Sequence, residues 1–115
     1  MHNFRNLKIW QKSRLIVKEV FLLTRNFPAE EKFGLVSQIL RSAYSIPSNI
    51  AEGSGRDTSK EFARFLDIAL GSAFELETQL ILAADVSYIS ESQLTDILNL
   101  LQEVQKMIYS FKTTL

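Results

Sequence analysis

The sequence predicts an all-α protein, an antiparallel up-down-up-down four-helix bundle whose second helix carries an internal proline. Four segments repeat apolar residues at spacings of three and four, the period of an amphipathic helix. Two of the connections carry the Ser/Thr-x-x-Glu/Gln pattern that opens helices, and no stretch alternates apolar and polar residues as a strand does. Because the connections are short, consecutive helices are expected to run antiparallel.

The amino-acid composition limits the kinds of site and activity that the chain can have. Its 115 residues suit one domain, residues 1–115, with a core that needs no disulfide or structural metal. There is no cysteine, and the single histidine, His2, is expected at a frayed terminus, so we expect no cofactor, no metal site and no enzymatic activity. No apolar run approaches the ~20 residues of a membrane span and the N-terminus is charged, which predicts a cytoplasmic protein without a membrane partner.

The first predicted helix spans residues 7–27, with Asn6 as its N-cap. Residues 1–27 hold six cationic and one anionic side chain, whereas residues 28–115 hold seven and twelve, so a basic helix joins an acidic body at zero net charge. The lysines form either a solvated face or a nucleic-acid patch, and the zero net charge favours the solvated face. Trp10 is expected to pack in the core or an interface. The candidates for binding an acidic partner are Arg5, Lys8, Lys12, Arg14, Lys18, Arg56 and Lys60.

The second helix is expected to start in the turn at Pro28 and to run through Pro47 to a stop at Gly53 or Gly55. A proline in a helix interior removes one backbone hydrogen bond and costs roughly 3 kcal/mol. Nearby serine hydroxyls can bond the carbonyls that the proline leaves without a partner. These serines are Ser42, Ser45 and Ser48, and the expected apolar face of the helix is Phe33, Leu35, Val36, Ile39, Leu40, Tyr44, Ile46 and Ile50.

Capping boxes open the third and fourth helices, one from Thr58 to Glu61 and one from Ser90 to Gln93. The third helix is expected to end near Asp85. Within it Gly71 belongs to a run of small residues, although a mid-helix glycine costs up to ~1 kcal/mol relative to alanine. Close approach of another helix, in this chain or in another subunit, would explain that glycine.

Four polar residues of the second helix are spaced so that one helical face presents them together: Gln38, Arg41, Asn49 and Glu52. They form either a network of hydrogen bonds within the protein that fixes the helix register or a surface that binds a partner molecule. The first interpretation is preferred because buried polar groups need hydrogen-bond partners. Glu52 precedes Arg56 by four residues, the favourable order for a helical ion pair. Glu75 and Glu77 point about 200° apart around a helix, so they cannot share one site unaided.

Residues 45–53, Ser-Ile-Pro-Ser-Asn-Ile-Ala-Glu-Gly, resemble the signature of the four-helix bundle proteins encoded in intervening sequences of bacterial 23S ribosomal RNA genes. The similarity spans nearly the whole chain. Its other matches are Phe4-Arg5-Asn6-Leu7 with Trp10, Phe27-Pro28 with Glu31, Gly34-Leu35 with Gln38 and Arg41, Phe62 with Phe65-Leu66, and Ala69-Leu70-Gly71-Ser72 with Glu75, Glu77, Gln79-Leu80 and Tyr88.

The resemblance implies a homopentameric barrel of four-helix protomers with no known catalysis. A related branch comprises the accessory proteins of diversity-generating retroelements, which bind a reverse transcriptase and, through basic surfaces, nucleic acid. Such chains are also called ribosomal protein-like, although a chain of zero net charge lacks the cationic excess of a protein buried in ribosomal RNA. The structural signature that the resemblance assigns to this chain is Gln38, Arg41, Pro47, Asn49, Glu52, Gly53, Glu75 and Glu77.

Two functional hypotheses follow. The leading one is a non-catalytic, oligomeric binding or scaffold protein that engages RNA or another acidic partner through its basic first helix. The alternative is a structural homo-oligomer or a protein–protein adaptor, for example to a reverse transcriptase, that uses its charges for subunit assembly. An enzyme is the least favoured class.

Overall fold

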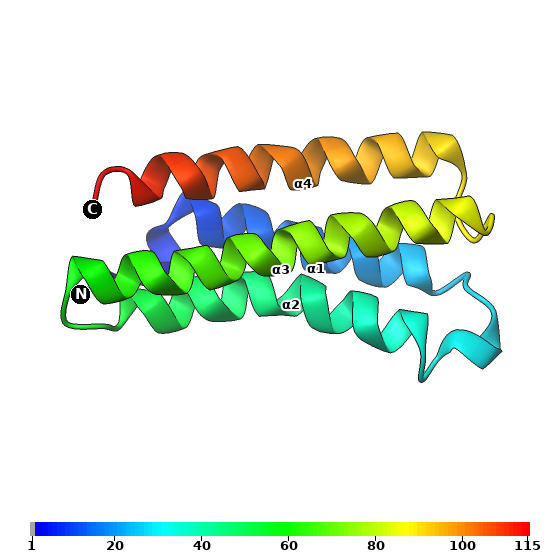
Figure 1. Cartoon of the computed structure of the whole chain (residues 1–115), viewed down its shortest axis with the longest axis horizontal. Coiled ribbons are helices and arrows are strands. Elements are labelled where there is room, and N and C mark those ends of the chain that lie inside the picture. Colours follow the sequence, from blue (N-terminus) through cyan, green and yellow to red (C-terminus); the bar gives the residue numbers. More distant parts are fainter. Residues whose placement is uncertain (1) are drawn as a thin grey trace.

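A computed structural model describes residues 2–115, and all regular structure in this range is helical. Each α-helix packs against its neighbours along the chain, and the first also packs against the last (Figure 1). The molecule measures 43 × 25 × 20 Å. The elements are the 3-10 turn η1 (Phe4–Asn6), α1 (Lys8–Thr24), the 3-10 turn η2 (Ala29–Glu31), α2 (Leu35–Ser54), α3 (Ser59–Asp85) and α4 (Glu91–Lys112).

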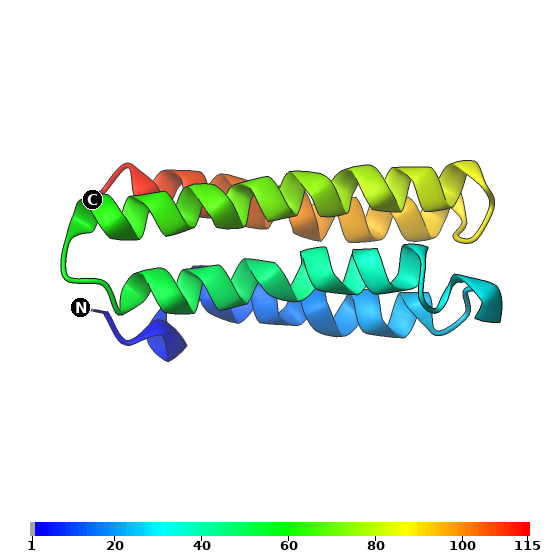
Figure 2. The same cartoon turned by 60° about the horizontal axis from the view of Figure 1, so that its bottom comes forward.

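Successive helices run in opposite directions along the long axis, and the connections lie at the two ends of the rod (Figures 1 and 2). The arrangement agrees with the up-down-up-down bundle that the sequence predicts. The apolar stripes of the four helices meet along the axis and exclude water, which is the main source of stability in such a bundle. Each helix contributes large side chains that are fully buried, among them Ile16, Ile39, Ile46, Leu66, Leu76, Leu101 and Ile108.

The start of α1 differs from the expectation. Asn6 does not cap the helix, because it lies in η1, and Leu7 occupies the N-cap position without a side-chain bond. The capping side chain is that of Asn3, whose Oδ1 accepts a hydrogen bond from the Arg5 N–H at 3.2 Å and so starts η1 instead. The helix also ends earlier than expected, at Thr24.

His2 makes ordered contacts with the bundle, contrary to the expectation of a frayed terminus. Its backbone N–H donates to the Ser54 carbonyl at 2.9 Å. The imidazole centroid lies 5.2 Å from that of Phe62 and 5.9 Å from that of Phe111. The chain before α1 is therefore attached to the end of α2 and to an aromatic cluster of α3 and α4.

The predicted start of α2 at Pro28 is wrong, because η2 and a turn precede the helix, which begins at Leu35. A contact between distant parts of the chain holds this connection. The Tyr88 hydroxyl donates to Glu31 Oε2 at 2.8 Å, and the Leu35 N–H donates to Glu31 Oε1 at 3.4 Å. The bond to the Glu31 carboxylate raises the pKa of Tyr88 above its ordinary value, because ionisation would remove the donor. Phe33, expected on the apolar face, lies in this connection with 89% of its surface exposed.

The helix continues through Pro47, as predicted, and ends at Ser54 with Gly55 as its C-cap. The expectation that serine hydroxyls bond backbone carbonyls near the proline is wrong for Ser42 and Ser45, whose hydroxyls pair with side chains of α3. Tyr44, also expected on the apolar face, is 50% exposed. Because Ser42 and Ser45 bond side chains of α3, the side of α2 that faces α3 is more polar than the interface between bundle helices usually is.

Both predicted helix starts at capping boxes are confirmed. The Thr58 hydroxyl accepts from the Glu61 N–H at 3.1 Å, and α3 then runs to Asp85 as expected. Before α4 the bonds are reciprocal: Ser90 Oγ accepts from the Gln93 N–H at 3.0 Å, and the Ser90 N–H donates to Gln93 Oε1 at 2.9 Å. Local hydrogen bonding thus sets the start of these two helices. No helix within residues 2–115 has both the length and the apolar character needed to cross a membrane.

Candidate functional site

The signature stretch, residues 45–53, forms the last turns of α2 and divides its side chains among three environments. Ile50 is fully buried in the core. Pro47 lines a groove between α1 and α2. Asn49 faces the side on which α2 meets α3, where its Nδ2 donates to the Ser45 carbonyl at 2.8 Å and to Ser45 Oγ at 3.0 Å. The stretch therefore takes part in the core, in an α1–α2 surface and in an α2–α3 polar network.

Two side-chain bonds join α2 to α3 in that network. The Ser42 hydroxyl donates to Glu75 Oε1 at 2.6 Å, and the Ser45 and Ser72 hydroxyls pair at 2.9 Å. With the Asn49 bonds, they support the interpretation that polar residues of α2 fix its register against α3. Of the other three members of the predicted polar set, Gln38 and Arg41 line a cleft between α2 and α3 together with these serines, whereas Glu52 bonds Arg56 instead.

Gly53 marks a close approach of α2 to α3. A Cβ at this position would lie 2.6 Å from Phe65 Cβ and 2.9 Å from Phe62 Cδ1, closer than carbon atoms pack. Its role is therefore packing, and of the two glycines predicted as alternative ends of the helix, Gly55 is the one that forms the C-cap. Gly71 is the opposite case, because nothing lies within 4 Å of a Cβ built there. Within residues 2–115, therefore, no helix makes the close approach at Gly71 that would explain the glycine from inside the chain, and a neighbour in another subunit stays a prediction.

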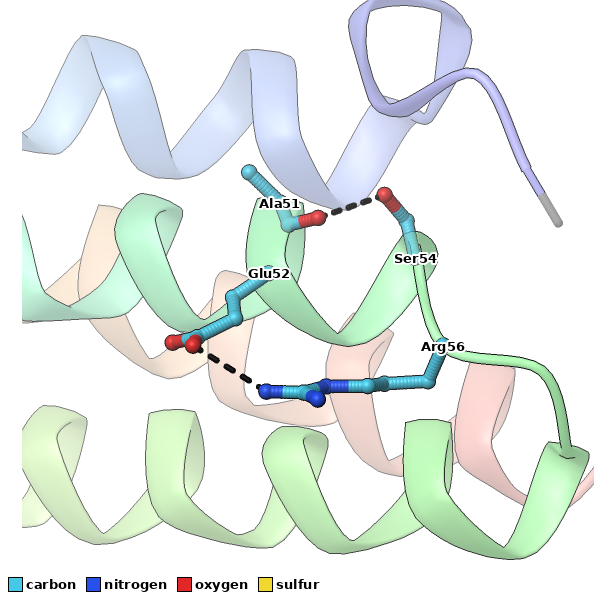
Figure 3. A network of polar contacts seen from close by, with 4 residues as sticks. All are labelled: Ala51, Glu52, Ser54 and Arg56. Atoms are coloured by element: carbon cyan, nitrogen blue, oxygen red, sulfur yellow. Dashed lines mark hydrogen bonds and ion pairs between the residues drawn. The ribbon is translucent and has the colours of Figure 1, made fainter.

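The end of α2 carries a polar cluster that stays within the helix and its connection (Figure 3). The Ser54 hydroxyl donates to the Ala51 carbonyl at 2.7 Å, and Arg56 Nη2 lies 3.2 Å from Glu52 Oε1. Both charged side chains are about half exposed, so this pair contributes only a few tenths of a kcal/mol. The Arg56 guanidinium also lies 4.7 Å from the Phe65 ring centroid, which places it against α3.

The two glutamates of α3 take part in different contacts, as their spacing predicts. Glu75 accepts from Ser42 of α2, whereas Glu77 accepts from Gln105 of α4 at 2.8 Å and from Gln102 at 3.4 Å. Within residues 2–115 no three acidic or histidine side chains are grouped as metal ligands.

The structure separates the predicted binding residues of the first segment into two groups. Lys12 Nζ lies 3.4 Å from Glu103 Oε1 of α4, and Lys8 lines the hollow between α1 and α4. Arg14 and Lys18 line the groove between α1 and α2 on the other side of α1. The predicted patch is therefore not continuous. Lys60 is exposed in the first turn of α3, at the end of the rod, apart from both groups.

Aromatic side chains lie among the cations of the second group. The Phe4 and Trp10 rings meet edge to face with centroids 5.1 Å apart. The Arg14 guanidinium lies 5.5 Å from the Trp10 centroid, and that of Arg5 lies 6.0 Å from the Phe4 centroid. Two adjoining hollows result, which share Trp10 and Arg14, and none of the described residues that line them is acidic. We call this the basic aromatic surface; its members are Phe4, Arg5, Trp10, Gln11, Arg14, Val17, Lys18, Tyr44, Pro47, Ser48 and Ala51.

Sequence reasoning missed the aromatic part of this surface. Trp10 was expected to pack in a core or interface, and it does pack, partly buried, against the core, but its exposed part was not predicted to take part in binding. Phe4 and Tyr44 were not singled out for binding. A signal was present, because Trp10, Arg14 and Lys18 are spaced by four residues and must lie on one side of a helix. Tyr44 joins them only because α2 packs beside α1, which no local pattern reveals.

Comparison with known proteins places the chain in a family. The family model described as 23S rRNA-intervening sequence protein matches residues 5–110. No curated protein matches the chain. The chain is similar to a crystal structure of a protein of unknown function from the S23 ribosomal protein family of Bacteroides thetaiotaomicron VPI-5482, with 32% identity and a TM-score of 0.84 over 90% of this chain and 97% of that one. Because both matches extend over nearly the whole chain, the protein belongs to the 23S rRNA-intervening sequence protein family.

Proposed function

We propose that this protein is a non-catalytic, homo-oligomeric binding module that holds single-stranded RNA on its basic aromatic surface. The observation that carries the proposal is the mixture of cations and aromatic rings in two adjoining hollows without an acidic wall residue. Surfaces that bind single strands combine cations that follow the phosphates with aromatic rings on which bases stack, at about 1–3 kcal/mol per stacked base. Arg5, Arg14 and Lys18 supply the charge here, and Trp10 and Tyr44 supply accessible rings.

The electrostatics of the whole chain set the expected strength of this binding. Net charge is zero, so attraction to RNA comes from the local field of the surface and is screened within about 10 Å at 0.1 M salt. Arg14 and Lys18 belong to none of the three ion pairs found within residues 2–115, so their charge can act on phosphates. Binding should therefore be modest for one protomer and grow with the number of surfaces in an assembly.

Charge reversal of the surface tests the proposal. The double variant Arg14→Glu, Lys18→Glu is expected to bind a single-stranded RNA at least about tenfold more weakly, because two attractive interactions with phosphates become repulsive. The slope of log affinity against log salt should fall by about 0.7 for each phosphate that is no longer neutralised. Fluorescence polarisation across a salt series from about 50 to 200 mM measures both quantities.

Lys12→Glu is the matched control, since Lys12 lies on the same helix but is paired with Glu103 on the α4 side. It should change RNA affinity less than the double variant. If RNA binding is absent at the lowest salt, or if Lys12→Glu weakens it as much as the double variant does, the basic aromatic surface is not an RNA site.

The proposed assembly rests on a second surface. The outward face of α3 exposes four large apolar side chains around the glycine at position 71: Ile68, Phe74, Ile81 and Leu82. Exposed apolar patches of this kind mark interaction sites in soluble proteins, and a glycine among them lets another helix approach closely. We propose that a second copy of the chain covers this face, and the family resemblance favours a homopentamer.

The same apolar face favours the alternative function, a structural oligomer or an adaptor to another protein such as a reverse transcriptase. In that case the cations of α1 hold subunits together rather than RNA. Light scattering separates the two: if high salt or reversal of Arg14 and Arg25 dissociates the assembly, the charges act in assembly. If the mass of the assembly changes under neither condition, the cations are not needed for assembly and are available to bind a partner outside the oligomer.

A further inference from the structure

A polar cleft lies between α2 and α3, the two helices seen side by side in Figure 2, on a different side of the protomer from the basic aromatic surface. Its volume is about 560 Å³, within the range of small-molecule sites. All of its lining residues are polar or charged, although helix interfaces in bundles are usually apolar. The register network explains Ser42, Ser45 and Ser72, but it does not use Gln38, Arg41 or Gln79.

Gln79 is the anomaly of this cleft. The residue is only 9% exposed, and its Oε1 is shielded from solvent with no hydrogen-bond partner among residues 2–115. A buried polar atom left unpaired destabilises a fold, so such atoms need an explanation. The terminal torsion of a glutamine side chain is soft, which allows the amide to turn its oxygen toward a group in the cleft.

The hydrogen bonds around the cleft define what a ligand must supply. Ser42 uses its only hydrogen on Glu75 Oε1, so Ser42, Glu75 and the Gln79 oxygen offer acceptors to the cleft. Arg41 offers a guanidinium, which binds carboxylates through two parallel N–H bonds. No ion pair within residues 2–115 joins Arg41 to Glu75, although both line the cleft. The walls thus present one cation and one anion with neutral polar groups between them.

We propose that this cleft binds a small zwitterion that carries a primary ammonium and a carboxylate, the chemistry of a free amino acid. The ammonium lies against Glu75, where it also supplies the hydrogen that Gln79 Oε1 lacks. The carboxylate is bound by Arg41, with the Gln38 amide beside it. A ligand with only one of these charges leaves the other wall charge without a partner and binds more weakly.

Calorimetric titration of the assembled protein tests this proposal. The probes are glycine, β-alanine and γ-aminobutyrate, which separate the two charges by increasing lengths, and the single-charge controls are butylamine and butyrate. We expect at least one zwitterion to bind saturably, about tenfold or more tightly than either control. Arg41→Gln and Glu75→Gln should each weaken that binding at least tenfold. Arg64→Gln, an exposed change on α3 that does not line the cleft, should leave it unchanged.

Gln79→Met supplies a readout that a merely structural role would not give. It removes the unpaired oxygen, so the ligand-free protein should melt at a higher temperature while its affinity for the zwitterion falls. The proposal is overturned if no zwitterion of the series saturates, if butylamine or butyrate binds as tightly as the best zwitterion, or if the Arg41 and Glu75 variants bind it as the unaltered protein does.

Discussion

Gly53→Ala should lower the free energy of unfolding by up to about 3 kcal/mol, the upper range for overpacking a well-packed interface. The added methyl group would lie 2.6 Å from Phe65 Cβ, an atom fixed to the backbone of α3, so the helix itself must move. Phe62, 2.9 Å away, is buried and has little room to rotate. Domains of this size have about 5–15 kcal/mol of stability in total, so the loss is large. Urea denaturation of the purified protein measures it.

Gly55→Ala is the matched control, two residues farther along. The φ angle of Gly55 is −88°, which any residue adopts, and a Cβ there meets only the Glu52 carbonyl oxygen at an ordinary 3.6 Å. This variant should unfold within about 0.5 kcal/mol of the unaltered protein, as surface changes usually do. Equal stability of the two alanine variants would contradict the close α2–α3 contact at Gly53.

A second large effect is expected for assembly. The double variant Phe74→Asp, Ile81→Asp should convert the proposed oligomer to monomers of 13.1 kDa, because burial of two carboxylates in an apolar subunit contact is strongly unfavourable. Phe74 is 55% exposed and Ile81 is 39% exposed, so each side chain packs within the protomer over only part of its surface. Light scattering gives the mass, and circular dichroism should show unchanged helix content.

The control for assembly is Phe33→Asp. Phe33 is the most exposed large apolar side chain of the described residues, but it lies in the connection before α2 rather than on α3. Its replacement should leave the mass of the proposed oligomer unchanged. An unaltered protein that is monomeric at micromolar concentration, or a Phe74, Ile81 double variant that keeps its full mass, would contradict the proposed interface.

The fold was predictable wherever local chemistry decides the structure. The starts of α3 and α4 follow from side chains that bond backbone groups three residues away, so Thr58 and Ser90 could be identified from the sequence. The end of α2 was predictable less closely, because both Gly53 and Gly55 fit a helix stop by composition. Only the position of α3 shows that one glycine serves packing and the other capping.

The start of α2 could not be predicted because a distant contact determines it. Glu31 accepts hydrogen bonds from Leu35 and from Tyr88, a residue 57 positions away, and the second bond holds η2 beside the α3–α4 connection. For the same reason the two side-chain hydrogen bonds between α2 and α3 were missed. Ser45 has suitable backbone carbonyls nearby, and its pairing with Ser72 depends on the register of two helices.

The candidate site was predictable in part. Sequence identified the cations of the first segment, but not that Lys12 faces Glu103 while Arg14 and Lys18 face α2. Their positions around α1 follow from helix geometry, whereas the identity of each neighbouring helix does not. The aromatic members Phe4 and Tyr44 join Trp10 through η1 and α2, so the surface exists only in the folded chain.

Fluorescence of Trp10 tests the central proposal most directly, because it is the only tryptophan of the chain and lies within the basic aromatic surface. Titration with single-stranded RNA at low salt should quench its emission saturably as bases stack on the indole, and rising salt should restore the emission. RNA that is bound in a mobility-shift assay while Trp10 emission stays unchanged would contradict this account.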